Sequence, residues 1–418
     1  MYRRANNIPL HLFHYQMLLK LAWRNIFRNK RRSLITTSSI IFAVLFAVFM
    51  RSLQFGAYGN MLDNIVGSYM GYIQVHNKGF WEEKTIDNSF SVEEIEHLTS
   101  SENITYLSPR IEGFALASFK DESKPVALLG LDAAIEKEHI NLDEKVVEGR
   151  YFSEQHKGLL VGKGLRDIMK LKLGDTLVFL GQGYQGSMAS GLYPIVGFID
   201  LKTPELNKRT VIMNLDQAQE LFALPGLVTT ALVGIDGDDW QGAQQEVIAA
   251  VDTNALEVMN WQEMLPELQQ LISVDKAGGT FILMILYSII TFSLFGTVLM
   301  LTEERSFEYG VLVAIGMGKN KIIQVAILET ILMAIAGVIA GLVLAFPIVL
   351  YFNINPINLS GQMQEVVEKF GFEALIPTSL DPSIALTHSG IIFLIVLVVN
   401  LYTIFKIKSL HPITAMRK

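Results

Sequence analysis

The chain has 418 residues, of which 50% are hydrophobic, and its formal net charge at pH 7 is −7. It contains no cysteine, which excludes disulfides, thiolate metal sites and a lipid-modified N-terminal cysteine. The segment from Ser52 to Lys276 holds 17 basic and 33 acidic residues, hence a formal charge of −16, and offers no basic surface to a nucleic-acid partner.

Four apolar runs predict transmembrane helices. We place them at residues 34–53, 280–301, 322–352 and 384–405, each about long enough to cross a hydrocarbon core of ~30 Å as a helix. Residues 1–33 precede the first span, and 21–28 have the pattern of a basic amphipathic helix on the membrane surface. The apolar run after Arg32 lacks a small-residue cleavage pattern, so we expect an uncleaved signal anchor.

Lysine and arginine near the ends of the spans predict the orientation of the chain. The first 51 residues contain nine of them and no Asp or Glu, and more follow in the 302–321 loop and the 406–418 tail. The 353–383 loop contains one, Lys369. We therefore expect a multi-pass protein of the cytoplasmic (inner) membrane, with both termini and the 302–321 loop in the cytoplasm and residues 54–279 in the periplasm.

The segment 54–279 combines β-favouring runs with helical patterns in irregular order. We predict strands at 71–76, 113–119, 125–129, 176–180, 193–199, 210–213 and 230–235, and helices at 92–98, 164–170, 216–221, 240–251 and 261–273. This order does not indicate a doubly wound parallel sheet. The predicted fold is a membrane α-helical protein of four transmembrane helices, with a large α+β domain between helices 1 and 2.

We find no catalytic motif in this domain. Residues 158–164 (GLLVGKG) differ from a phosphate loop in glycine spacing, and they have Gly164 where a magnesium-binding Ser or Thr belongs. The histidines are isolated and lack metal-ligand spacing. The chain is therefore predicted to have no catalytic residue, no metal site and no bound cofactor, and not to be an enzyme.

Residues 304–316 have the form E-R-x-x-E-x-G-x-L-x-A-x-G. In this loop, and in 21–32 and 411–417, the sequence resembles permease subunits of ABC transporters of the MacB/FtsX and lipoprotein-releasing type. The resemblance implies that the loop forms a coupling helix seated on a separate ABC ATPase, which binds ATP and magnesium. It also implies that two permease chains pair, of one kind or two. The residues that match the coupling motif are Glu304, Arg305, Glu308, Tyr309 and Gly310.

Three further stretches, 71–76, 147–152 and 159–175, resemble lipoprotein-releasing (LolC/LolE-like) subunits. The resemblance implies extraction of a lipoprotein from the outer leaflet, through a crevice between the first and second spans. The apolar residues Phe49, Leu53, Phe55 and Met61 offer acyl chains a surface there, or simply pack against the second span. The glycine-rich hairpin at 181–191 either binds a periplasmic carrier protein through Tyr184 and Met188 or is a flexible tip.

Two other functions of this family are kept as alternatives: peptide or drug efflux, as in MacB, and regulation of a cell-wall hydrolase, as in FtsX. The size of the 54–279 domain favours lipoprotein release, since the regulators have smaller insertions. Within the spans, Gly337 and Gly341 form a small-xxx-small pattern that suits packing inside one chain or pairing of two. Glu329, about two turns into the third span, is expected to face the protein interior or the cytoplasmic interface, since a carboxylate facing lipid is costly.

Overall fold

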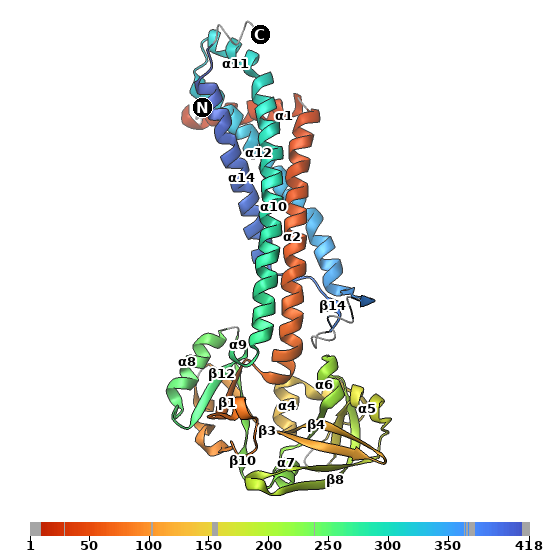
Figure 1. Ribbon diagram of the computed structural model, residues 1–418. Coiled ribbons are helices and arrows are strands. Elements are labelled where there is room, and N and C mark those ends of the chain that lie inside the picture. Colours follow the sequence, from red (N-terminus) through yellow and green to blue (C-terminus); the bar gives the residue numbers. More distant parts are fainter. Residues whose placement is uncertain are drawn as a thin grey trace, which may run out of the picture. The chain divides into compact units, whose positions relative to one another are not determined.

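The computed structural model describes residues 10–28, 30–101, 103–152, 158–237, 239–362, 364, 367 and 373–411. Lys369 and residues 412–417 of the C-terminal motif lie outside these ranges. The chain divides into two compact units (Figure 1). The helical unit comprises Met1–Ala57, Ser273–Ile357 and Ile376–Lys418, and the α+β unit comprises Tyr58–Ile272 and Asn358–Leu375.

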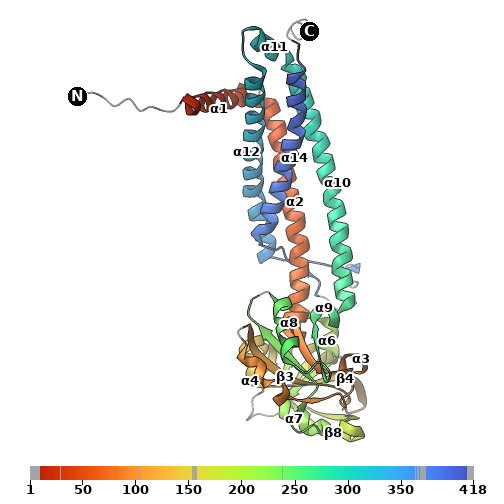
Figure 2. The same ribbon diagram turned by 90° about the vertical axis from the view of Figure 1, so that its left-hand side faces the viewer.

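Among the described residues, four stretches are helical, long and apolar enough to cross a membrane: Ser33–Gly67, Pro266–Glu304, Lys319–Ile354 and Pro382–Lys408. The helices themselves are α2 (Lys30–Leu62), α10 (Pro266–Glu304), α12 (Lys319–Ile354) and α14 (Pro382–Lys408). They extend beyond the predicted spans because helical hydrogen bonding continues through the polar residues at their ends, whereas an apolar run marks only the middle. In the helical unit they lie side by side (Figures 1 and 2).

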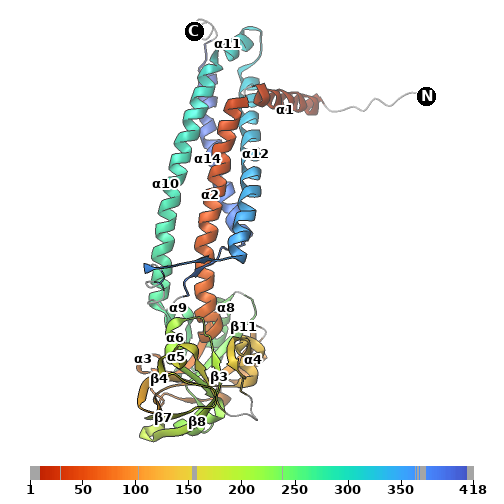
Figure 3. The same cartoon turned by 90° about the vertical axis from the view of Figure 1, so that its right-hand side faces the viewer.

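The core of the helical unit is formed by small and branched residues of all four helices. Gly337 and Gly341 of α12 face α2, where an added Cβ would come within 2.7 Å of Ile40 and 2.8 Å of Val44. These glycines therefore serve helix packing inside one chain. Helix α1 (Leu10–Arg28) runs crosswise to the four helices (Figure 3) and buries Leu18 and Ala22.

The described part of the α+β unit holds a ten-stranded sheet with the path β12-β1-β11-β3-β4-β9-β6-β8-β5, and β7 pairs with β3 and β8. Its strands are β1 (Ile73–Asn77), β3 (Ile104–Phe119), β4 (Glu122–Leu131), β5 (Val146–Gly149), β6 (Leu159–Gly162), β7 (Thr176–Gln182), β8 (Met188–Ile199), β9 (Thr210–Asn214), β11 (Thr230–Ile235) and β12 (Leu256–Asn260). Only β4–β9 and β6–β8 pair in parallel among the described pairings. Two-stranded sheets join β2 (Phe90–Ser91) to β10 (Leu227–Val228), and β13 (Ile357–Asn358) to β14 (Leu375–Ile376).

Helices of this unit are short. They are α3 (Phe80–Glu83), α4 (Ala133–Ile140), α5 (Lys163–Met169), α6 (Pro204–Arg209), α7 (Leu215–Phe222), α8 (Trp240–Ala250) and α9 (Trp261–Met264). Helix α7 packs on β4 at Gly130, where an added Cβ would lie 2.1 Å from the Cβ of Ala218. The mixed sheet and short helices confirm the predicted fold class, with the α+β domain between the first and second long helices.

A buried arginine connects the segment after α2 to the sheet. A π-helical segment, η1 (Asp63–Met70), follows α2 and ends at Gly71, whose φ is 75°. Arg110 of β3 donates a hydrogen bond to the carbonyl of Tyr69 in η1. Its Nε and Nη2 donate to the two carboxylate oxygens of Glu136 at 2.7 and 2.8 Å, with side chains only 2% and 0% exposed. Breaking such a pair typically costs about 3–5 kcal/mol, so Glu136 of α4 holds Arg110 in the position from which it bonds η1.

Candidate functional site: the coupling helix and its anchors

The 302–321 loop contains one helix, α11 (Ser306–Ala314), as the sequence predicts. Arg305 separates it from α10, and its own carbonyl accepts a hydrogen bond from the Tyr309 N–H at 2.9 Å. At the other end, Gly316 has a φ of 103°, and the Met317 N–H bonds the Leu312 carbonyl at 2.9 Å. A left-handed glycine is a usual helix stop, so the chain reverses here into α12.

Arg305 does not point into solvent. Its Nη1 donates to Glu329 of α12 at 2.5 Å, and the side chains are 7% and 6% exposed. Asn25 of α1 also hydrogen-bonds Glu329. Glu329 therefore faces the protein interior, as expected for a carboxylate in a span. The start of α11 is held to α12 by a buried charge pair, and Asn25 of α1 bonds the same carboxylate.

Tyr309 is likewise buried. It packs in a cluster at the same end of the helical unit, whose other buried members are Ile322, Ile323, Ala326, Ile407 and Leu410. Burial raises the pKa of its hydroxyl, although Arg305 acts in the opposite direction, so the side chain stays neutral. Gly310, the next residue, is also buried. Arg305, Tyr309 and Gly310 thus anchor α11 rather than present a surface.

Further polar contacts tie α11 and its flanking residues to neighbouring helices. Glu308 pairs with Arg28 of α1, and Lys406 of α14 pairs with Glu303 of α10. The hydroxyl groups of Thr302 and Thr403 lie 3.3 Å apart, and Lys319 Nζ donates to the Lys408 carbonyl at 2.9 Å. The Arg28–Glu308 pair is about half exposed, and pairs of this kind contribute about 0–1 kcal/mol. The buried Arg305–Glu329 pair is therefore the main charged anchor.

The outward side of α11 and its C-terminal turn is apolar. Phe307 is 51% exposed, Leu312 36% and Ile315 78%, and Glu304 is also exposed. Sequence analysis selected the charged and tyrosine positions of the motif and missed these three. The i, i+4, i+8 repeat of Phe307, Val311 and Ile315 could have found two of them, because it places apolar residues along one side of a short helix. Leu312 is not part of this repeat.

The four crevice residues predicted at the outer end of the first helix have different surroundings. Phe49 packs against Phe352 of α12, with ring centres 5.7 Å apart, and Leu53 is half-buried. Phe55 is 38% exposed, and the Arg51 guanidinium lies 5.9 Å from the centre of its ring. Met61 belongs to the α+β unit, where it packs in an apolar cluster with Trp261 and Met264.

The hairpin predicted at 181–191 consists mostly of strand. Strands β7 and β8 pair from Thr176 opposite Pro194 to Gln182 opposite Met188. The turn is short and hydrogen-bonded, with Gln185 N donating to Asp87 at 2.6 Å. Tyr184 is half-buried against the core, whereas Met188 is 78% exposed. Only Met188 of the two predicted residues projects from the hairpin.

Met188 belongs to an exposed apolar sheet face that sequence analysis missed. Pairing places Leu116 opposite Leu180, and Leu192 opposite Val178, so alternate residues of β3, β7 and β8 share one face. The large exposed members are Phe114, Leu116, Leu180, Met188 and Leu192, from 41% to 78% exposed. We call these five residues the apolar sheet face. The available signal was the spacing of large apolar residues by two or four positions, as in Phe114 and Leu116, Val178 and Leu180, and Met188 and Leu192.

The described residues include no group of three or more His, Asp or Glu side chains placed to hold a metal ion. His76 on β1 is buried, and its Nε2 lies 2.7 Å from the side-chain oxygen of Gln74. Burial, with a smaller contribution from the charge of Lys84, lowers the pKa of His76 to about 3. His76 is therefore a neutral core residue at physiological pH.

Comparisons with known proteins give consistent matches. The sequence profile of the MacB-like periplasmic core domain matches residues 33–250, and that of the FtsX-like permease C-terminal domain matches residues 280–412. A search of curated proteins gave no match.

Two solved structures resemble the extramembrane part. One is the periplasmic region of MacB from Actinobacillus actinomycetemcomitans, with 14% identity over 51% of this chain and 97% of that one, at a TM-score of 0.36. The other is the extracellular domain of the noncanonic ABC-type transporter YknZ from Gram-positive bacteria, with 16% identity over 46% of this chain and 100% of that one, at a TM-score of 0.33.

Proposed function

Since this chain belongs to the family of ABC transporter permeases with a MacB-like periplasmic core domain and an FtsX-like C-terminal domain, we propose that it transmits the motion of a separate ATPase to that domain. Members of this family work with ABC ATPases. The observation that carries the proposal is the construction of α11. Its apolar residues Phe307, Leu312 and Ile315 are exposed, while Arg305 and Tyr309 hold it rigidly to the helical unit.

A surface of this kind suits protein docking. Large apolar side chains exposed at the tip of a short helix are costly in water, and a partner that covers them gains the hydrophobic free energy. The buried anchors prevent the helix from yielding when the partner moves. In this proposal the ATPase binds ATP and magnesium, and the permease carries out no catalysis itself.

The orientation follows from charge. With the basic ends of the spans in the cytoplasm, α11 and both termini face the ATPase, and the α+β unit lies in the periplasm. The chain is then a multi-pass protein of the cytoplasmic membrane. Each ATPase pair needs two permeases, so a second copy or a related chain completes the transporter.

We further propose that the cargo is a lipoprotein released from the outer leaflet. The apolar sheet face supports this, because Phe114, Leu180, Met188 and Leu192 present large apolar side chains on one side of the sheet. A periplasmic carrier that shields acyl chains exposes apolar surface when empty and suits such a face. The motif stretches at 71–76, 147–152 and 159–175 support the same function.

The proposal is tested by purifying the full chain from membranes in mild detergent and identifying what accompanies it. Mass spectrometry is expected to find an ABC ATPase and acylated polypeptides. Changing Phe307 and Ile315 together to alanine is expected to lower recovery of the ATPase about tenfold or more, since central interface side chains each contribute over 1 kcal/mol. Phe346→Ala, which removes a ring 63% exposed within the α12 span, serves as the control and is expected to change nothing.

The outcomes separate the two parts of the proposal. Unchanged ATPase recovery in the Phe307/Ile315 variant would refute the docking surface. An ATPase without acylated polypeptides would refute lipoprotein release and leave the coupling function standing, and a co-purified cell-wall hydrolase would identify the regulatory alternative.

A further inference from the structure

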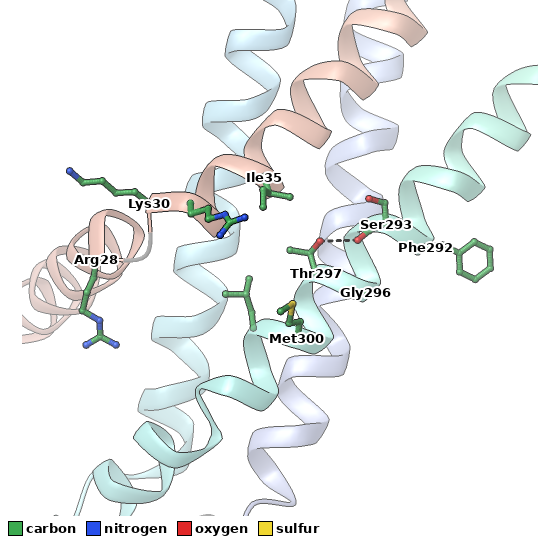
Figure 4. Close-up of a pocket in the computed structure, with 10 residues that line it drawn as sticks. Arg28, Lys30, Ile35, Phe292, Ser293, Gly296, Thr297 and Met300 are labelled. Carbon is green, nitrogen blue, oxygen red and sulfur yellow. Dashed lines mark hydrogen bonds between the residues drawn. The ribbon is translucent and has the colours of Figure 1, made fainter. Parts of the chain in front are cut away.

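A large cavity lies in the helical unit where α1 and the start of α2 meet α10. Its volume is about 830 Å³, within the range of small-molecule sites. Figure 4 shows that its lining comes from two sides: basic side chains from α1 and α2, and apolar or small residues from α10.

The charged side chains that line this cavity are all basic. Arg28, Lys30 and Arg31 line it, and no Asp or Glu is among its described lining residues. Arg28 is paired with Glu308, but Lys30 and Arg31 are exposed and have no ion pair within the described part of the chain. Within the described residues, Lys30 and Arg31 therefore have no acidic partner at the rim of the cavity.

The lining opposite the cations is apolar at Met300 and small at Gly296 of α10, and Ile35 of α2 adds an apolar side chain. Ile35 is 51% exposed and Met300 56%, and Gly296 has open space around its backbone, with no atom within 4 Å of where a Cβ would stand. The hydroxyl of Thr297 is already used, since it donates to the Ser293 carbonyl of its own helix at 2.9 Å. A ligand that fits here carries negative charge at one end and a hydrocarbon chain at the other.

We propose that this cavity binds an anionic phospholipid, with its phosphate against Lys30 and Arg31 and an acyl chain along Ile35 and Met300. Basic pockets between transmembrane helices at the cytoplasmic side are suited to anionic lipid headgroups. The assignment of this lipid to the inner leaflet depends on the orientation proposed above. The binding itself rests only on the cavity.

A second permease is a poorer occupant. In a two-fold symmetric pair the same surface of both copies meets, and the two uncompensated cations of one chain would face those of the other. Their repulsion disfavours that contact, whereas lipid phosphate neutralises both charges. A lipid in this position would hold α1 and α2 to α10 by filling the space between them.

The absence of cysteine permits a direct test. A single cysteine introduced as Thr297→Cys, labelled with a fluorophore, reports lipid contact in nanodiscs through quenching by brominated phospholipids. Brominated phosphatidylglycerol and brominated phosphatidylcholine are compared at equal mole fraction. We expect stronger quenching by the anionic lipid. In Lys30→Gln/Arg31→Gln the preference is expected to fall on the order of tenfold, because each basic residue adds a several-fold gain in affinity for anionic lipid.

The matched control is Lys20→Gln/Lys321→Gln. It removes the same charge from two exposed basic residues of the helical unit that do not line the cavity, and it is expected to retain the preference. An equal loss in both variants would show general surface attraction and overturn the proposal, as would equal quenching by the two lipids.

Absence of quenching by either lipid would mean that protein covers the position and would also overturn the proposal. Disulfide cross-linking of unlabelled Thr297→Cys would then identify a second copy. The assay needs neither ATPase nor cargo, and both leaflets of the nanodisc have one composition. Its failure is therefore distinct from failure of the proposed transport function.

Discussion

The buried pair between Arg305 and Glu329 is expected to control how firmly α11 is held. The change Glu329→Gln leaves the guanidinium in a site that is 7% exposed, without the carboxylate that neutralised it. Glu329 lies ten residues into α12, about 15 Å along the helix from Lys319, so water gives Arg305 little compensation there. Breaking a buried pair in this way typically costs about 3–5 kcal/mol.

The assay is amide hydrogen exchange of the full chain in nanodiscs. A loss of about 3–5 kcal/mol from the anchored state corresponds to roughly 200- to 5000-fold faster exchange, wherever local opening limits exchange. The acceleration is expected in α11 (Ser306–Ala314), while the strands of the α+β unit exchange as before. Arg28→Gln is the matched control, since it breaks the half-exposed pair to Glu308 and is expected to change exchange less than about fivefold.

A double variant separates charge from packing. Arg305→Met/Glu329→Met removes both charges and keeps two long side chains, and such replacements of buried pairs are often neutral or stabilising. Its exchange is therefore expected to lie close to wild type and well below the single variant. If Glu329→Gln and Arg28→Gln gave equal exchange, or if the single effects added in the double variant, the buried pair would not be the anchor of α11.

Two further predictions concern orientation and pH. A cysteine at Ser187 is expected to react with a membrane-impermeant thiol reagent in cells with a permeabilised outer envelope, and one at Ser306 is not; the reverse pattern would invert the proposed topology. Because the pKa of His76 falls from 6.5 to about 3 on folding, the unfolded state binds the extra proton, so the stability present above pH 6.5 is lost as pH falls toward 3. Urea unfolding of the full chain, monitored by fluorescence at pH 7 and pH 5, is the test. The wild type is expected to be about 2 kcal/mol less stable at pH 5 than at pH 7, and His76→Gln is expected not to show this loss. An equal loss in both would exclude His76 as the cause.

The spans and their order could be predicted from sequence because long apolar runs have few alternative structures. The helix ends could not, since α10 begins at Pro266, where the sequence is polar. The helix predicted at 261–273 is divided at Leu265, because Pro266 cannot donate the hydrogen bond that would continue α9. Polar residues at the end of a long helix stay helical because they are hydrogen-bonded to the adjacent turn. They do not raise the local hydropathy, which is the property used to predict a span.

In the α+β unit, sequence patterns located most strands but not their pairing. Strand β3 runs from Ile104 to Phe119, whereas only 113–119 was predicted, because Pro109 and Arg110 interrupt the alternation. Arg110 is explained by a partner 26 residues away, Glu136 of α4, a helix that was not predicted. Long-range ion pairs of this kind cannot be read from local periodicity.

The coupling motif shows the same limit at the level of single residues. The charged and aromatic residues of this motif suggested a docking surface. Arg305 and Tyr309 are instead buried in contacts that anchor the helix. Whether a charged residue in a motif is exposed depends on the helix that packs over it. Here that helix is α12, whose Glu329 was predicted to face the interior or the cytoplasmic interface, with no partner predicted for it.

This division of roles limits how force can pass through the chain. A docking helix transmits displacement only if its own attachment is stiffer than its contact with the partner. Exposed pairs such as Arg28–Glu308 are too weak for that, whereas a buried pair together with the Tyr309 cluster resists several kcal/mol of distortion. In the α+β unit, Arg110 of β3 donates a hydrogen bond to the Tyr69 carbonyl of η1, and its buried pair with Glu136 of α4 holds the guanidinium in that position. In each unit a buried ion pair thus lies beside the element that follows a long helix, α11 after α10 in one unit and η1 after α2 in the other. The proposed coupling therefore requires both pairs to be intact.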